Sequence, residues 1–125
     1  MVEIAPGELI DKITILEIKL ENIRDKDKLV NVRREYEILT GVIQKEVVPS
    51  DALSRLTAAL KDVNAELWRI EDDIRAQERA KTFGAEFVAL ARSVYRTNDR
   101  RAALKREIND LLNSAIIEEK SYAAY

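Results

Sequence analysis

Residues 51–84 read DALSRLTAALKDVNAELWRIEDDIRAQERAKTFG and contain the clearest heptad pattern in the 125-residue chain. Apolar residues recur there every three or four positions, at Leu53, Leu56, Leu60, Val63, Leu67, Ile70 and Ile74. This spacing predicts an amphipathic helix from about Asp51 to Lys81, roughly 45 Å long at 1.5 Å per residue. Ser50 or Asp51 can cap its start.

A second long apolar stripe follows the turn at residues 82–84. It comprises Phe87, Leu90, Val94, Leu104, Ile108 and Leu111. The stripe predicts another long helix, ending near Asn113 and Ser114. Two long helices joined by so tight a turn must lie side by side and run antiparallel.

Two shorter helices are predicted before this hairpin. The first follows Pro6-Gly7 and ends near Arg24, and its stripe comprises Leu9, Ile13, Leu16, Leu20 and Ile23. The second resumes near Lys28 and stops at Val48-Pro49-Ser50. No segment alternates with period two. The sequence therefore predicts an all-α fold: an antiparallel four-helix bundle with coiled-coil-like packing, one domain over residues 1–125, in which 115–125 form a loosely ordered tail.

Composition limits the chemistry that the chain can perform. The chain has no histidine and no cysteine, and its net charge is −2. Histidine-dependent nucleophiles, histidine zinc sites and thiol chemistry are thereby excluded. We expect neither a cofactor nor a resident metal. No apolar run reaches the roughly 18 residues that a membrane span needs, and the start lacks the features of a secretory signal. A cytoplasmic protein without a membrane partner is expected.

Residues 92–106, RSVYRTNDRRAALKR, carry six basic side chains and one acidic one. Three arginines spaced i, i+4, i+8 share one helix face: Arg92, Arg96 and Arg100. A second row contains Arg101 and Lys105. Polar residues also occupy positions where the heptad pattern calls for apolar ones, at Thr97, Asn98 and Arg101.

Three interpretations of this basic segment stay open. It can be a solvated face whose side chains pair within the helix. It can be a polar layer in which Asn98 and Arg101 pair with carboxylates of another helix. It can also be a site for a carboxylate or phosphate ligand. For the polar layer the first helix offers Glu8, Asp11 and Glu17 as counter-charges. We expect the partner acid to be Glu17, at the edge of the first apolar stripe, or an acid of the third helix. In the hairpin, facing residues have numbers that sum to about 165, which places Arg101 opposite Asn64.

The first helix offers a weaker signal, the pair Glu8 and Asp11. Both acids suit the positive end of a helix dipole, so that a helix start is the simpler interpretation. Half of a magnesium site, of the kind that some helical pyrophosphatases use, is the alternative. All-helical chorismate mutases provide another comparison, but glutamate stands here where their first helix carries arginine before Ile-Asp.

Two segments together resemble an uncharacterised bacterial family of all-helical domains of unknown function. They are PGELIDKITILEIK at 6–19 and VYRTNDRRAALKREIN at 94–109. The resemblance extends over the whole chain and supplies no substrate. It implies that the signature segments of the family contain Glu8, Asp11, Lys12, Glu17, Asn98, Asp99 and Arg101.

The function predicted from the sequence is a non-catalytic helical interaction module that self-associates. Uneven helix lengths leave part of the long apolar stripe uncovered, which favours a homodimer or a protein partner. The alternative is a small helical enzyme or binder that holds an anionic ligand with its arginines. A nucleic-acid partner is disfavoured by the acidic balance of the chain.

Overall fold

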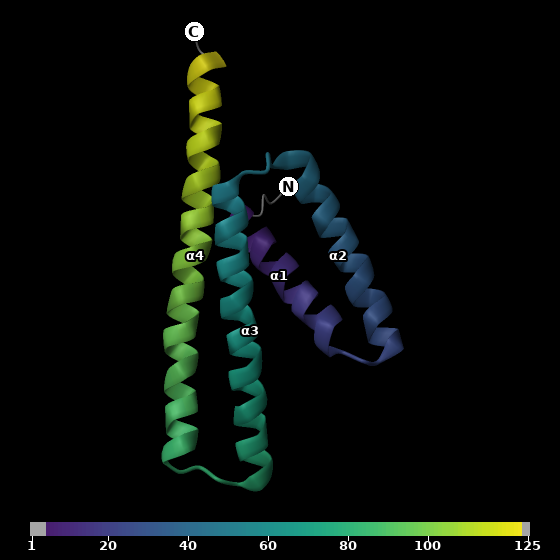
Figure 1. The fold of residues 1–125 in the computed structure, drawn as a ribbon, viewed down its shortest axis with the longest axis vertical. Helices are drawn as coiled ribbons and strands as arrows, with labels where there is room; N and C mark the ends of the chain where they lie inside the picture. The colour runs from purple at the N-terminus through teal and green to yellow at the C-terminus, as the bar shows by residue number, and fades with distance from the viewer. Residues whose placement is uncertain (1–4, 124–125) are drawn as a thin grey trace.

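The computed structural model describes residues 5–123, with side-chain positions as far as Asn113, and consists of four helices (Figure 1). Helix α1 spans Pro6–Asn22, α2 Lys26–Glu46, α3 Asp51–Ala80 and α4 Ala85–Ala123. No strand occurs within residues 5–123. The prediction of an all-α bundle with a long hairpin of the third and fourth helices is therefore confirmed.

Local capping sets the boundaries of α2 and α3. The Asp25 carboxylate accepts from the backbone N–H groups of Asp27 (3.0 Å) and Lys28 (3.3 Å), so that α2 begins slightly before the expected start. The Ser50 hydroxyl accepts from the N–H of Leu53 at 3.1 Å, as expected of an N-cap. Lys81, in the left-handed region with φ 56°, ends α3.

Helix α4 is longer than the sequence predicts. It passes the expected end near Asn113 and Ser114 and continues to Ala123. The side chains of 114–125 lie outside the described part of the chain, so that a loosely ordered tail at 115–125 stays a prediction. None of the helices combines, within the described residues, the length and apolar character that a membrane crossing requires.

Helix α1 is the central element of the packing. It contacts α2, α3 and α4, and α3 and α4 pair extensively with each other. In Figure 1, α1 lies between α2 and the α3–α4 hairpin, and α2 is on the outside. The apolar side chains of α1 accordingly enter the core with those of the hairpin. The central cluster comprises Ile10, Leu53, Leu60 and Ile108.

The start of α1 approaches the backbone of α4 closely at Gly7. Its N–H donates to Oδ1 of Asn109 at 2.7 Å. A Cβ atom on Gly7 would collide with the carbonyl oxygen of Lys105 and would lie 2.9 Å from Oδ1 of Asn109. Only glycine therefore lets the two helices approach this closely without a shift of the backbone.

We expect Gly7→Ala to lower the free energy of unfolding by about 1–3 kcal/mol, because a backbone carbonyl cannot move aside as a flexible side chain can. Gly41→Ala is the matched control. Nothing lies within 4 Å of a Cβ at Gly41, so that alanine in mid-helix should stabilise the protein by about 0.5–1 kcal/mol. Urea unfolding followed by circular dichroism measures both. Equal shifts in the two variants would contradict the close approach at Gly7.

Candidate functional site

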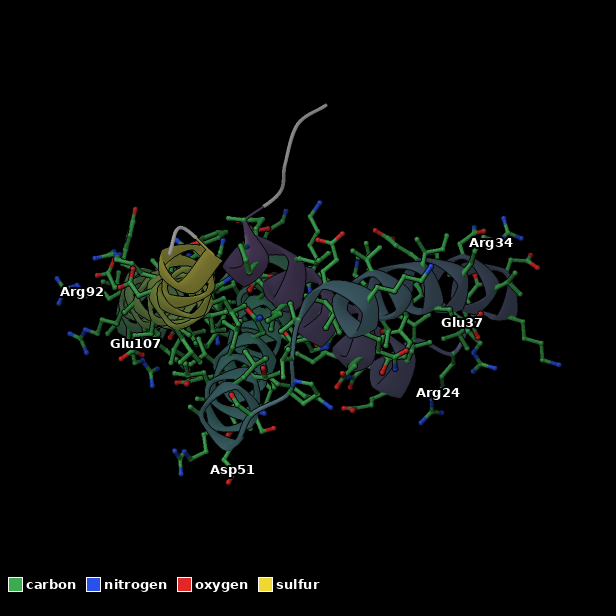
Figure 2. The ribbon with its side chains drawn as sticks, turned by 90° about the horizontal axis from the view of Figure 1, so that it is seen from above. Arg24, Arg34, Glu37, Asp51, Arg92 and Glu107 are labelled. Carbon is green, nitrogen blue, oxygen red and sulfur yellow. The ribbon has the colours of Figure 1, made fainter. Side chains whose placement is uncertain are left out.

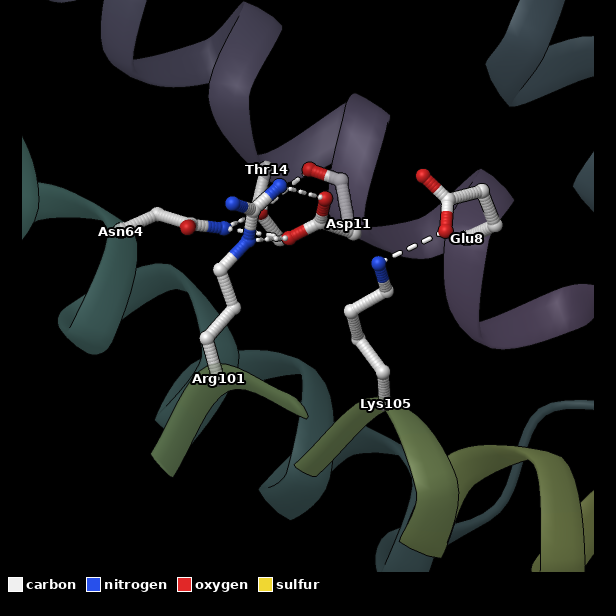
Figure 3. A network of polar contacts seen from close by, with 6 residues as sticks. All are labelled: Glu8, Asp11, Thr14, Asn64, Arg101 and Lys105. Atoms are coloured by element: carbon white, nitrogen blue, oxygen red, sulfur yellow. Dashed lines mark hydrogen bonds and ion pairs between the residues drawn. The ribbon is translucent and has the colours of Figure 1, made fainter. Parts of the chain in front are cut away.

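A buried carboxylate, that of Asp11 on α1, is the centre of the main polar cluster (Figure 3). Asp11 is only 1% exposed. The guanidinium of Arg101 on α4 meets it side-on: Nε donates to Oδ1 at 2.9 Å and Nη2 donates to Oδ2 at 2.5 Å. Two parallel hydrogen bonds between opposite charges are the strongest arrangement available to such a pair. The pair fixes α1 to α4.

Two buried side chains, Asn64 and Thr14, complete this cluster. Nδ2 of Asn64 on α3 donates both to Oδ1 of Asp11 and to Oγ1 of Thr14, each at 2.9 Å. The Thr14 hydroxyl in turn donates to the backbone carbonyl of Asp11 at 2.7 Å. The cluster therefore links three helices, and both carboxylate oxygens have donors.

The environment of Asp11 keeps it ionised. Burial alone would raise its pKa, but hydrogen bonds from Arg101 and Asn64, with the positive charges of Arg101 and Lys105, outweigh burial and lower the pKa. The hydrogen bond to Asp11 raises the pKa of Arg101 in turn, despite the opposing effect of burial. The two groups thus hold each other in their charged forms.

Ion pairs nearer the surface surround the cluster. Nζ of Lys105 lies 2.6 Å from the carboxylate of Glu8, a second link between α4 and α1. Nζ of Lys61 on α3 lies 3.0 Å from Glu17 and 2.7 Å from Glu21. The hydrogen bonds to Glu21 and Glu17 raise the pKa of Lys61. These pairs are partly hydrated and individually weak, but they hold α1 against both long helices.

The partner that the sequence suggests for Arg101 is wrong. Glu17 pairs with Lys61, and Asp11 takes its place at Arg101. The reason is helical geometry: six residues turn the helix by about 240°, so that Asp11 and Glu17 cannot both face α4. The interpretation of Glu8 and Asp11 as half of a metal site loses its support, because each carboxylate is paired with a cation of α4.

The interpretation that places Asn98 in a polar layer is also not supported. Asn98 is exposed, whereas the preceding residue, Thr97, is 1% exposed. The seam of α4 follows the three- and four-residue steps from Val94 through Thr97 to Arg101, which turns Asn98 outward. One residue of displacement rotates a side chain by about 100°, enough to move it from the interface to solvent.

The three arginines of the outer face line neither of the two best-formed hollows among the described residues. Arg100 pairs with Glu66 at 2.9 Å. Arg92 and Arg96 are exposed and form no ion pair within the described residues, and Figure 2 shows Arg92 pointing away from the helices. An apolar hollow of about 450 Å³ lies elsewhere, between the end of α2 and the start of α3. Its lining includes Ile43, Val47, Leu53 and Ala58 and no residue of the basic segment.

Sequence reasoning offered Asp11 only as one of several possible counter-charges, and it missed Thr14 and Asn64 as members of the polar cluster. A signal existed for each. Asp11, Thr14 and Ile18 follow a three-four spacing that marks a second buried stripe on α1. The pairing of facing residues in the hairpin did place Asn64 opposite Arg101. It assigned Asn64 no role, because Asp11, the residue to which both donate, lies on α1.

We expect Arg101→Met to destabilise the fold by about 3 kcal/mol, because it leaves the Asp11 carboxylate buried without its cation. Arg101→Ala should cost more, since methionine replaces the packing of the arginine stem and alanine does not. The neighbouring Arg100→Met is the control: its ion pair is exposed, so that the cost should stay below about 1 kcal/mol. Similar losses at positions 100 and 101 in urea unfolding would contradict a special role for Arg101.

The loss in Arg101→Met should depend on pH in a defined direction. In the wild type the lowered pKa of Asp11 contributes stability above the unfolded pKa, and this contribution fades as pH falls through the folded pKa. In Arg101→Met burial raises the pKa of Asp11, so that at acidic pH the carboxylate is protonated and the variant no longer buries an unpaired charge. The difference in unfolding free energy between the two proteins should therefore shrink towards acidic pH. At neutral pH the double variant Asp11→Asn/Arg101→Met should lose less unfolding free energy, relative to the wild type, than Arg101→Met alone.

Comparisons with known proteins complete the description of the site. No protein of curated function matches the chain, and no solved structure matches it. A family of unknown function, DUF6165, does match, over residues 1–125. The match includes both helices of the central pair, α1 with Asp11 and α4 with Arg101. By this match along its whole length, the chain belongs to the family DUF6165.

Proposed function

We propose that this protein is a non-catalytic helical interaction module that self-associates as a homodimer. The proposal is supported first by the contacts of the protein's charged groups, which pair with one another across the helices. The donors of Arg101 that face inward are bonded to Asp11, and Lys105 is paired with Glu8. Groups that are committed to hold helices together are poorly suited to bind and turn over a substrate.

The observation that carries the proposal is the state of α2. Its 21 residues include none that is buried, and α1 is the element against which it packs. Val30 is 58% exposed, Ile38 60% and Val42 39%. In most globular proteins an amphipathic helix is stabilised by burial of an apolar face. A helix that buries so little within its own chain is a natural surface for a partner.

Self-association predicts a concentration-dependent mass. Sedimentation equilibrium from low to high micromolar concentration should show a transition from the 14.3 kDa protomer towards twice that mass. A single species of 14.3 kDa throughout this range would eliminate the homodimer.

A second candidate function, binding of an anion, rests on Arg92 and Arg96. These exposed arginines lie one helical turn apart and form no ion pair within the described part of the chain. Guanidinium groups in such a pair suit phosphate or carboxylate. Neither arginine lines either of the two best-formed hollows among the described residues, which makes this candidate the weaker of the two.

Selective stabilisation by anions tests this second candidate. If the arginines form an anion site, phosphate should raise the melting temperature more than chloride at equal ionic strength, because a ligand of the native state stabilises it by mass action. The gain should vanish in the double variant Arg92→Gln/Arg96→Gln. Phosphate also stabilises proteins through exclusion from their surfaces, so that equal gains in wild type and variant would leave the arginines as a solvated face.

A further inference from the structure

The outward side of α2 carries a heptad stripe of its own. Its members are spaced 4-3-4-3 and are all exposed: Asn31, Glu35, Ile38, Val42 and Lys45. The stripe that is partly covered comprises different residues, Leu29, Val32, Tyr36, Leu39 and Ile43. The two stripes are separated by roughly 120° around the helix. On this side, the outer seam, helix α2 therefore presents two exposed apolar side chains, Ile38 and Val42, with Glu35 before them and Lys45 after them.

This outer seam is complementary to itself when two copies run antiparallel. With a two-fold axis beside residue 40, facing residues have numbers that sum to about 80. Ile38 then faces Val42 of the other copy, and Glu35 faces Lys45 of the other copy. Each contact occurs twice, so that a central apolar layer is flanked on both sides by opposite charges. Charged pairs beside an apolar contact set the orientation of the helices in coiled coils as well.

We propose that two copies of the chain dimerise through α2, antiparallel, along the outer seam. The inference rests on the proposed self-association and specifies where it occurs. Figure 1 shows α2 on the outside of the molecule, with α1 between most of its length and the α3–α4 hairpin, so that a second α2 can approach from the outer side without displacing another helix. The seam is short, which makes the contact reversible and concentration-dependent.

The charges of the seam have no competing partners. None of the residues three or four positions from either charge is itself charged. For Glu35 these residues are Asn31, Val32, Ile38 and Leu39, and for Lys45 they are Gly41, Val42, Val48 and Pro49. Neither charge can therefore form the usual intrahelical pair. Within the described residues, the ion pairs of the protein involve neither Glu35 nor Lys45. Opposite charges on a second copy would neutralise both.

The same charges fix the orientation. Parallel helices in register would place Glu35 against Glu35 and Lys45 against Lys45, which is repulsive at both ends of the apolar layer. Antiparallel helices replace each repulsion by an attraction. Electrostatics therefore select the antiparallel dimer over the parallel one, although each exposed pair contributes little to affinity.

A charge swap tests the pairing directly. In Glu35→Lys two lysines face each other at each end of the seam, and in Lys45→Glu two glutamates do so. Each single substitution should weaken the dimer at least about tenfold in sedimentation equilibrium, because the change acts at both symmetric contacts. The double variant Glu35→Lys/Lys45→Glu restores opposite charges and should regain the affinity of the wild type.

Matched controls keep the result specific to the seam. Glu37→Lys and Arg33→Glu make the same charge changes on the other exposed side of α2 and should leave dimerisation unchanged. Circular dichroism of every variant verifies that the exposed substitutions preserve the helices. Higher salt should strengthen the dimers of the single variants relative to that of the wild type, since it screens repulsion and attraction alike.

The outcomes separate this inference from the proposed function. A dimer that persists in both single variants, or one that the double variant fails to restore, overturns pairing through the outer seam and leaves self-association standing. A wild type that stays monomeric up to high micromolar concentration overturns both. A loss of dimer affinity in each single variant, with recovery in the double variant, supports the antiparallel seam. That pattern is expected when position 35 of one copy faces position 45 of the other.

Discussion

The ion pair between Asp11 and Arg101 is the constraint on which the arrangement of the helices depends. A carboxylate that is 1% exposed is costly unless it is paired and hydrogen-bonded. In the observed placement of α1 the carboxylate receives the side-on guanidinium of Arg101 and the amide of Asn64 together. Apolar surfaces can slide past one another at low cost, whereas this cluster fits in a single register. The pair therefore constrains the register of α1 against α4.

The position of α1 in turn determines that of α2. The close approach at Gly7 and the pair of Glu8 with Lys105 hold the start of α1 on α4. Lys61 holds the rest of α1 against α3. With α1 wedged beside both long helices, α2 can reach only α1 along most of its length. The polar contacts of one short helix thus explain why another helix is left on the surface.

The sequence predicted the elements well because their signals are local. The stripe of α3, the cap at Ser50 and the turn before Gly84 all depend on residues near one another in the chain. The polar cluster was predictable only in part. That Arg101 needs a carboxylate follows from its place in the heptad, but the choice of Asp11 over Glu17 depends on how α1 is rotated against α4. This rotation is decided by many weak contacts among three helices, which no local pattern encodes.

The exposed state of α2 then connects the internal network with the proposed dimer. A helix gains little from its own backbone in water and depends on packing. The cap at Asp25 and the partial cover by α1 stabilise α2, yet Ile38 remains 60% exposed and Val42 39% exposed. The spacing of Ile38 and Val42 between two isolated opposite charges is what an antiparallel partner requires, and a second copy of the chain supplies all four groups in the matching order.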